Sequence, residues 1–253
     1  MHTAMVDVRT SDGVADAYLA HPDDGHRHPA VLFYMDGIGL RPRLSEMAER
    51  IAAHGYLVLV PNLFYRHGRA PLVADLSDLL KPENRAKLME SFRRFATSLT
   101  PEAAMRDAAA YVNFLSAHRS VTSGPIGITG YCMGGAMALR TAAAFADRVA
   151  AAASFHGGNL ATDAPDSPHL LADRIRAELY LGHADQDRSM TQEQIVRLEA
   201  ALDSAGVRYR SELYPGAAHG FTMADTAAYN AAATDRHWTN LLALLDRNLP
   251  AAG

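Results

Sequence analysis

The sequence has a single cysteine, no excess of basic residues and no long hydrophobic run, and each shortage narrows the possible functions. Cys132 is the one cysteine among 253 residues, so no intramolecular disulfide can form and nothing indicates an oxidising compartment. A formal net charge of -4 gives no basic face for nucleic acid and no polybasic membrane patch. No apolar run approaches the roughly 18 residues of a membrane span. The first seven residues also lack the features of a secretory signal. We therefore expect a cytoplasmic protein that binds neither nucleic acid nor a membrane.

The overall composition is that of an ordinary globular chain. Hydrophobic residues make up 49% and charged residues 21% of the sequence, which is enough apolar material for a sizeable core. Larger α/β folds commonly reach about 250 residues as one domain. We therefore expect a single domain over residues 1–253, present as a monomer or a small homo-oligomer.

Hydrophobic periodicity indicates an α/β fold. Segments 5–9 and 14–19 alternate apolar and polar residues around a short turn, as an antiparallel hairpin does. Strands that are apolar throughout, alternating with amphipathic helices, predict a mostly parallel sheet covered on both faces. The expected later strands are 30–35, 56–60, 126–129, 148–155, 177–182 and 207–214, and the expected helices are 42–54, 83–98, 101–118, 136–139 onward, 191–205 and 226–247. Residues 62–82 show no clear period and predict an irregular segment that could overhang a site.

A sharp turn between a strand and a helix surrounds the cysteine. Cys132 follows the strand that ends near Gly130, and the helix starts almost at once through Gly134 and Gly135. Glycines lack a Cβ atom, so they let strand and helix approach closely. This is the G-x-S-x-G nucleophile elbow with cysteine in place of serine.

The elbow has a chemical interpretation and a structural alternative. A thiol at the first turn of a helix lies in the positive field of the helix N-terminus, which favours the nucleophilic thiolate. The backbone N–H of Met133 would supply half of an oxyanion hole for the incoming carbonyl oxygen. The alternative is that Cys132 is only a small buried residue, as free cysteines often are.

Other polar residues follow the ends of the predicted strands, where ligands bind in open α/β sheets. We expect His219 to be the base that activates Cys132, and Asp185 to hold the imidazole in the required tautomer. Asp187 could equally be the acid, and His156 and His183 also stand at strand ends. Position after the last strand favours His219, and proximity to its strand favours Asp185. The order nucleophile, acid, histidine is that of α/β-hydrolases.

A metal site is the competing interpretation of the same segments. His183, Asp185 and Asp187 could in principle ligate zinc. The sequence has no helical His-x-x-x-His pair to support such a site. We therefore expect no metal.

Taken together, these segments resemble the dienelactone hydrolase family, a cysteine-nucleophile branch of the α/β-hydrolases. The matching pieces cover most of the chain in order: Gly130-Tyr131-Cys132-Met133-Gly134-Gly135, Val60-Pro61-Asn62-Leu63-Phe64, Gly182-His183-Ala184-Asp185 and Tyr214-Pro215-Gly216-Ala217-Ala218-His219-Gly220-Phe221. The resemblance implies an α/β-hydrolase fold and cofactor-free cleavage of an ester or enol-lactone through an acyl-thioester on Cys132. It also implies a second oxyanion donor, the backbone N–H of Gly37.

Two substitutions distinguish this chain from family members that cleave dienelactones. Those members carry a glutamate that holds the thiol in check, whereas this chain has the shorter Asp36. They bind the substrate carboxylate with arginine, one of them four residues after the catalytic histidine, where this chain has Met223. Arg85 could match a second family arginine, although a solvated charge explains it as well. We therefore expect Asp36 to tune the thiol or touch substrate, and we expect an uncharged or differently shaped ester.

The sequence thus predicts a hydrolase that acts on small carboxylic esters or lactones. Two competing hypotheses assume the same fold in a protein that does not hydrolyse a substrate. In one, Cys132 is a redox-sensing thiol that peroxide oxidises. In the other, the protein binds a small molecule and does not turn it over.

Overall fold

The computed structural model describes residues 1–73 and 81–249, and its eight strands form one sheet in the order β1-β2-β4-β3-β5-β6-β7-β8. β1 and β2 pair antiparallel, as do β2 and β4, and the remaining neighbours pair parallel. The strands are β1 (His2–Thr10), β2 (Gly13–His21), β3 (Ala30–Tyr34), β4 (Leu57–Pro61), β5 (Ile126–Tyr131), β6 (Val149–Phe155), β7 (Glu178–Gln186) and β8 (Tyr209–Ala218). This confirms the predicted α/β fold with its N-terminal hairpin.

The burial of each strand follows its place in the sheet. Every residue of β3, β4 and β5 is buried, because helices cover both faces at the centre of the sheet. β1 lies at one edge and exposes most of its residues. β8 lies at the other edge, and of its residues only Tyr214 and Ala217 are buried.

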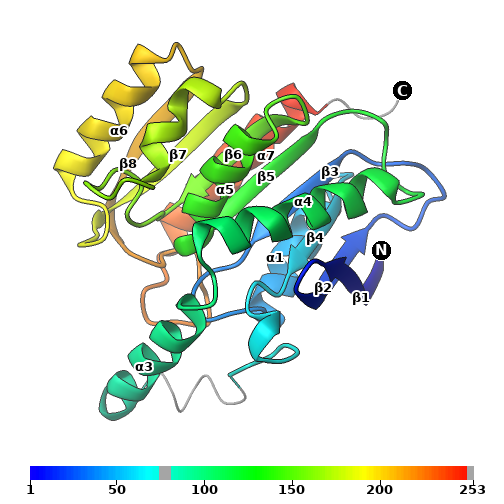
Figure 1. The fold of residues 1–253 in the computed structure, drawn as a ribbon, viewed down its shortest axis with the longest axis horizontal. Coiled ribbons are helices and arrows are strands. Elements are labelled where there is room, and N and C mark those ends of the chain that lie inside the picture. The colour runs from blue at the N-terminus through cyan, green and yellow to red at the C-terminus, as the bar shows by residue number, and fades with distance from the viewer. Residues whose placement is uncertain (74–80, 250–253) are drawn as a thin grey trace.

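Two helical layers enclose the sheet. In Figure 1, α4 and α5 lie in front of the strands and α7 lies behind them. The helices are α1 (Pro42–Ala52), α3 (Arg85–Ala96), α4 (Pro101–Ala117), α5 (Met133–Ala144), α6 (Gln192–Ser204) and α7 (Ala231–Asn248). Within the described residues, no helix combines the length and the apolar character that crossing a membrane requires.

Helix starts agree with local capping chemistry. Pro42 and Pro101 stand at the first turns of α1 and α4, where a missing N–H costs nothing. The Thr100 hydroxyl accepts a hydrogen bond from the Ala103 N–H at 3.3 Å, as an N-cap does.

The last helix was predicted to start near residue 226, and this is wrong. α7 begins only at Ala231 because the Asn230 side chain caps it by accepting from the Ala233 N–H at 3.0 Å. Residues 220–230 instead form successive turns, such as the bond from the Met223 N–H to the Gly220 carbonyl. These turns matter for the site because they form one of its walls.

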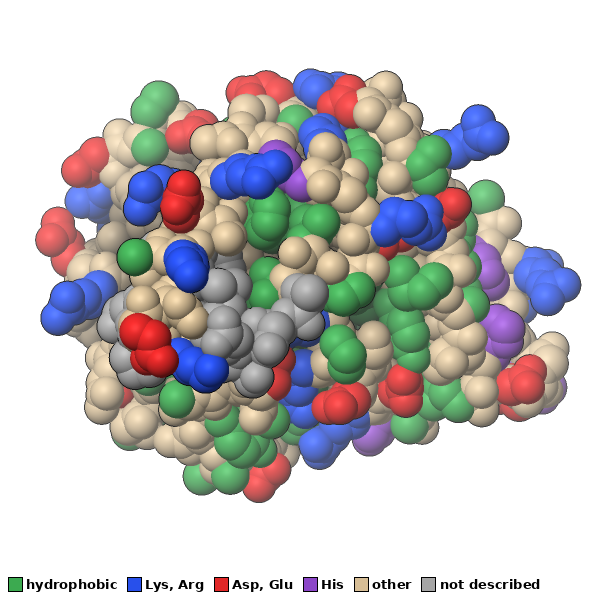
Figure 2. All heavy atoms as spheres, turned by 90° about the horizontal axis from the view of Figure 1, so that it is seen from below, with side chains coloured by type: hydrophobic (Ala, Val, Ile, Leu, Met, Phe, Trp, Pro, Cys, Tyr) green, Lys and Arg blue, Asp and Glu red, His purple; other side chains and the backbone are tan. Residues whose placement is uncertain are grey.

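The described part of the segment after β4 packs against α4 through Arg66 and Asp107. A 3-10 helix spans Tyr65–His67, and Arg66 pairs with the fully buried carboxylate of Asp107 at 2.8 Å. Residues 74–80, the rest of the predicted overhang, lie outside the described residues. α3 then extends away from the sheet at the lower edge of Figure 1. Seen from below in Figure 2, hydrophobic side chains gather near the middle of this face, with most charged side chains toward its edge.

Candidate active site

The turn from β5 into α5 holds Cys132 in a strained backbone conformation. Its φ is 57° and its ψ is -120°, a region that non-glycine residues rarely adopt. The Cys132 N–H donates to the Phe155 carbonyl at 3.1 Å on the neighbouring strand. The chain turns so abruptly that α5 starts at the next residue, Met133. The thiol therefore stands at the strand tip, at the N-terminus of a helix.

Three glycines make this turn possible, as the sequence predicts. A Cβ atom on Gly130 would lie 2.0 Å from the Gly134 carbonyl oxygen. One on Gly134 would lie 2.5 Å from the Tyr34 carbonyl oxygen, and one on Gly135 would lie 2.2 Å from the hydroxyl of Ser154. The backbone of α5 is thus packed directly against β3, β5 and β6, with no space for larger side chains.

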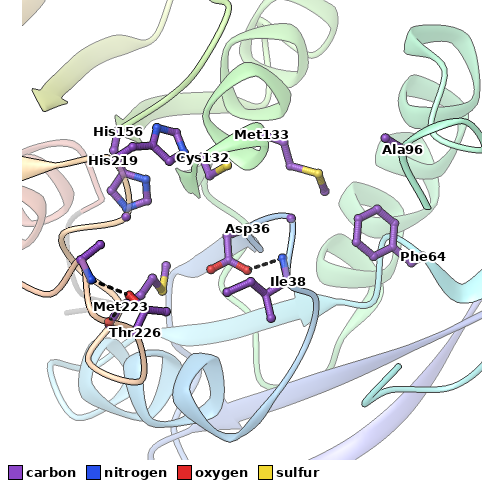
Figure 3. Close-up of a pocket in the computed structure, with 13 residues that line it drawn as sticks. Asp36, Ile38, Phe64, Ala96, Cys132, Met133, His156, His219, Met223 and Thr226 are labelled. Atoms are coloured by element: carbon purple, nitrogen blue, oxygen red, sulfur yellow. Dashed lines mark hydrogen bonds between the residues drawn. The ribbon is translucent and has the colours of Figure 1, made fainter. Parts of the chain in front are cut away.

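His219 faces the thiol from the loop after β8. Its imidazole and Cys132 both line one cavity, where Figure 3 shows them side by side. The Nδ1 atom of His219 lies 2.6 Å from Oδ2 of Asp187. The N–H and hydroxyl of Ser189 both donate to Oδ1 of the same carboxylate, at 2.8 and 2.6 Å. The structure therefore brings together a cysteine, a histidine and an aspartate.

The aspartate is Asp187, so the prediction that Asp185 orients the histidine is wrong. Asp185 is exposed, and its carboxylate accepts a hydrogen bond from the Gly216 N–H at 2.7 Å. The cause is the length of β7, which continues to Gln186 with a register shift between Ala184 and Gln186. Asp185 thus still belongs to β7, and the site begins two residues later.

The other two histidines at strand ends have partners elsewhere. The Nε2 atom of His156 lies 2.8 Å from the hydroxyl of Thr222, and that of His183 lies 3.2 Å from the hydroxyl of Ser211. Burial lowers the pKa of His183 to about 4. Burial and the neighbouring charge of His219 hold the pKa of His156 well below its usual value. Both rings are therefore neutral near pH 7, and His219 is the one that contacts a carboxylate.

The surroundings of His219 favour its protonated form. Burial alone would lower its pKa, but hydrogen bonds to Asp187 and Cys132 outweigh this and raise the pKa to about 10. For Asp187, burial acts to raise the pKa, yet the bonds from His219 and Ser189 lower it below 3.8. The imidazolium and the carboxylate stabilise each other, and a charged His219 also stabilises negative charge on the sulfur.

The two predicted oxyanion donors border the same cavity. Met133 is the first residue of α5, so its N–H has no acceptor within the helix. Gly37 follows β3 and, like Met133, lines the cavity beside Cys132. A substrate carbonyl placed between them would have backbone donors on two sides.

The cavity has a volume of about 460 Å³, and its walls are mostly apolar. The large apolar side chains come from several segments: Ile38 after β3, Phe64 after β4, Met133 on α5 and Met223 in the turns before α7. Asp36 is the one carboxylate among its described lining residues. Such a site suits a small and largely uncharged ligand.

Asp36 lies in the cavity wall, but its carboxylate is engaged away from the thiol. Oδ1 accepts from the Ile38 N–H at 3.0 Å, and Arg41 donates to both oxygens at 2.8 and 3.0 Å. Figure 3 shows the carboxyl group turned toward Ile38, with the Cys132 sulfur on the other side. Direct tuning of the thiol, one of the two roles expected for Asp36, does not fit this arrangement.

The aromatic side chains around the site divide between the cavity wall and the core. Phe64 lines the cavity, whereas Tyr34, Tyr65, Phe155 and Phe221 are buried in the core. Met223 lies in the wall at the position considered for an arginine. The side chain of Arg85 is outside the described part of the structure.

The competing zinc site finds no support in the described residues. His183, Asp185 and Asp187 each bond to a different partner, namely Ser211, Gly216 and His219. In the part of the chain that the structure covers, no three such side chains are grouped closely enough to hold a metal ion.

Sequence reasoning missed four residues of the site: Ser189, Thr222, Arg41 and Asp225. The Asp-x-Ser spacing of 187 and 189 is a local signal, since aspartate often accepts from the N–H two residues later. The contacts of Thr222 with His156 and of Asp225 with Arg41 join distant segments and have no such signal.

Comparisons with known proteins agree with this geometry. The family model described as the dienelactone hydrolase family matches residues 15–249. A Synechocystis protein provisionally named carboxymethylenebutenolidase is 26% identical over 250 residues, covering 98% of this chain and 97% of the relative. A Salmonella typhi protein with the same provisional name is 28% identical over 231 residues, covering 89% and 80%.

Solved structures show the same fold. A provisionally named dienelactone hydrolase from Klebsiella pneumoniae superposes with a TM-score of 0.84 at 20% identity, covering 97% of this chain and 98% of that one. A dienelactone hydrolase-like promiscuous phosphotriesterase from metagenomic libraries superposes with a TM-score of 0.80 at 22% identity, covering 98% of each chain.

Proposed function

Because this chain belongs to the dienelactone hydrolase family, we propose that it hydrolyses small uncharged carboxylic esters or lactones with Cys132 as the nucleophile. The observation that carries the proposal is the hydrogen-bonded series Cys132, His219 and Asp187 at the wall of an apolar cavity. The curated relatives share the name carboxymethylenebutenolidase, which supports an ester or lactone as the substrate class.

In the first half of the reaction, the proton of the Cys132 thiol resides on His219, and the sulfur attacks the carbonyl carbon, forming a C–S bond as the C=O π bond opens. The negative charge that develops on the carbonyl oxygen is held by the backbone N–H groups of Met133 and Gly37. The C–O bond to the leaving alcohol then breaks, and protonated His219 gives its proton to the departing oxygen. The product of this half is an acyl-thioester on Cys132.

In the second half, water replaces the alcohol. Neutral His219 removes a proton from a water molecule, the resulting oxygen attacks the thioester carbonyl, and the C–S bond breaks. His219 now carries the proton from water and Cys132 is again a free thiolate, so the site is back in its resting state when the carboxylic acid leaves. Asp187 stays ionised throughout and holds Nδ1 of His219, so that Nε2 faces the reacting atoms.

The lining of the cavity supports an uncharged substrate. Ile38, Phe64, Met133 and Met223 offer apolar surface, and the described wall contributes Asp36 as its carboxylate. A substrate carboxylate placed there would lose hydration, and the protonated His219 in the wall is already paired with Asp187. The proposed chemistry needs a reduced thiol and no cofactor, and the cytoplasm maintains reduced thiols.

The test compares a neutral aryl acetate, a neutral lactone and an anionic dienelactone, using the wild type and Cys132→Ala. We expect turnover of the neutral substrates, and a loss of roughly 10³-fold or more in kcat for Cys132→Ala. Mass spectrometry of the quenched wild type should show an acyl group on Cys132. Full activity in Cys132→Ala would contradict the nucleophile. Rapid oxidation of Cys132 by peroxide, without turnover of any substrate, would favour a redox-sensing thiol.

A further inference from the structure

Behind the cavity wall, Arg41 and Asp36 form a two-point ion pair. Nη1 of Arg41 lies 2.8 Å from Oδ1 of Asp36, and Nη2 lies 3.0 Å from Oδ2. Both side chains are only 6% exposed. This fork-to-fork arrangement is the one by which arginine binds a ligand carboxylate.

A second carboxylate holds the same guanidinium from another side. Nε of Arg41 donates to Oδ2 of Asp225 at 2.5 Å, and Nη2 donates to Oδ1 at 3.2 Å. Nη1 also donates to the Gly39 carbonyl at 3.1 Å. Burial would lower the pKa of Arg41, but the two carboxylates outweigh it and raise the pKa, so the guanidinium stays charged. Arg41 is thus fixed in place independently of Asp36.

Beside the His219–Asp187 pair, this cluster is the other charged group at the described wall of the cavity. Two carboxylates and one guanidinium leave the trio Asp36, Arg41 and Asp225 with one net negative charge. Asp36 lines the cavity, whereas Arg41 is not among its described lining residues. An incoming anionic group therefore meets the aspartate and not the arginine.

We propose that Asp36 occupies the carboxylate-binding fork of Arg41 and thereby makes the cavity selective for uncharged substrates. The Asp36 carboxylate takes the position on Arg41 that a substrate carboxylate would otherwise occupy. Without Asp36, Arg41 could bind a substrate carboxylate. The proposal rests on the esterase function proposed above and identifies the residues that determine its charge selectivity.

The geometry predicts what removal of the competitor does. Shortening Asp36 to alanine frees two N–H donors of Arg41 toward the cavity, while Asp225 still orients the guanidinium. Asparagine is the conservative alternative, since it keeps an oxygen for the Ile38 N–H and for Nη1 but places an NH₂ against Nη2. The loss of one negative charge makes the trio neutral in either variant. Anionic substrates gain from both changes, more so with alanine.

The test uses two ester pairs that differ only in charge: 3- and 4-acetoxybenzoate, each compared with its methyl ester. The readout is the ratio of kcat/KM for the anionic and the neutral ester of each pair. We expect the wild type to favour the neutral esters by roughly tenfold or more, and Asp36→Ala to raise the ratio by roughly tenfold, since a close charge contact contributes on this scale. Asp36→Asn should raise it less. Asp36→Ala combined with Arg41→Gln should lose the gain, because the freed donors are then absent.

Asp166→Asn is the matched control, since Asp166 pairs with Arg140 at 3.5 Å and does not line this cavity. Its ratio should equal that of the wild type. A ratio unchanged in Asp36→Ala, with neutral esters still hydrolysed, would overturn the proposal and leave the esterase function intact. An equal gain in the variant that lacks Arg41 would also overturn it.

A binding measurement tests the same proposal without turnover. In the Cys132→Ala background, calorimetry with 4-acetoxybenzoate should show roughly tenfold tighter binding after Asp36→Ala, and no gain when Arg41→Gln is added. If the wild type hydrolyses no ester, the proposed function fails, but this comparison still decides whether Asp36 masks Arg41. Unchanged affinity would count against the masking.

Discussion

His219 and Asp187 are joined by a 2.6 Å contact between Nδ1 and Oδ2 that connects the loop after β8 to the end of β7. The Asp187 side chain is 2% exposed, and Ser189 satisfies its second oxygen. A carboxylate held this firmly fixes both the orientation and the tautomer of the imidazole. Substitution of Asp187 should therefore lower activity by releasing the His219 imidazole, without removing any group that contacts the substrate.

We expect Asp187→Asn and Asp185→Asn to have very different effects, although they are the same chemical change two residues apart. Asp187→Asn should lower kcat/KM by roughly 10²- to 10⁴-fold, because the imidazole loses its carboxylate partner. Asp185→Asn should change it less than about threefold, since the exposed Asp185 only accepts from the Gly216 N–H. Steady-state kinetics on a neutral aryl acetate decides between them. Equal losses in the two variants would contradict the assignment.

Stability should depend on pH through His219. Its pKa is about 10 in the folded protein and 6.5 as the reference value. A raised pKa means that protonation favours the folded state, so the contribution is fully present below pH 6.5 and is lost as the pH rises through 10. Urea unfolding of the wild type and His219→Gln from pH 6 to 10 measures it. The free energy of unfolding of the wild type should exceed that of His219→Gln by an amount that decreases steadily with rising pH. An excess that increases with pH would refute the raised pKa of His219.

The close contact of α5 with β5 predicts a large cost for Gly130→Ala. The new Cβ atom would lie 2.0 Å from the Gly134 carbonyl oxygen, which is backbone and cannot rotate away. We expect a loss of about 3 kcal/mol or more in the free energy of unfolding, at the upper end of overpacking effects. Gly124→Ala is the control, because its Cβ would meet only the Thr122 hydroxyl at 3.9 Å. That variant should stay within about 0.5 kcal/mol of the wild type, and chemical denaturation measures both.

Backbone strain at Cys132 predicts an unusual order of stability among variants at this position. Cys132→Ala keeps a Cβ atom at φ 57° and ψ -120°, whereas Cys132→Gly removes it. Strain of this kind costs about 1–3 kcal/mol, which exceeds the 0.4–1 kcal/mol that glycine loses through the freedom of its unfolded chain. We therefore expect the glycine variant to be the more stable of the two. Thermal unfolding of both proteins checks this order, and a lower Tm for glycine would mean that the conformation carries no strain.

The sequence was sufficient for the fold because its signals are local. Segments such as 30–35 and 126–129 are apolar throughout, and the helices between them show a 3.6-residue period, so the layers follow from the pattern. Cys132 and His219 were predictable for a similar reason. Cys132 stands within a glycine-rich turn, and His219 follows the last strand.

Two features of the site depend on geometry that sequence patterns do not record. The choice between Asp185 and Asp187 depends on where β7 stops pairing with β8, and a register shift decides that. The pairing of Arg41 with Asp225 spans 184 positions. The partner of Arg41 is therefore determined by how the two loops pack, and no residue spacing near Arg41 or Asp225 indicates it.

One side of the cavity wall comes from a different part of the molecule than the reactive groups. Cys132, Asp187 and His219 follow β5, β7 and β8, whereas Phe64 and Ala96 reach the cavity from the segment that leaves the sheet after β4 and from the end of α3. Substitutions in that segment can reshape the cavity while the strands that carry Cys132, Asp187 and His219 stay untouched. New substrate ranges are thus accessible to natural selection by single steps that carry little risk to catalysis. A library confined to the walls is accordingly the efficient starting point for redirecting this enzyme in the laboratory.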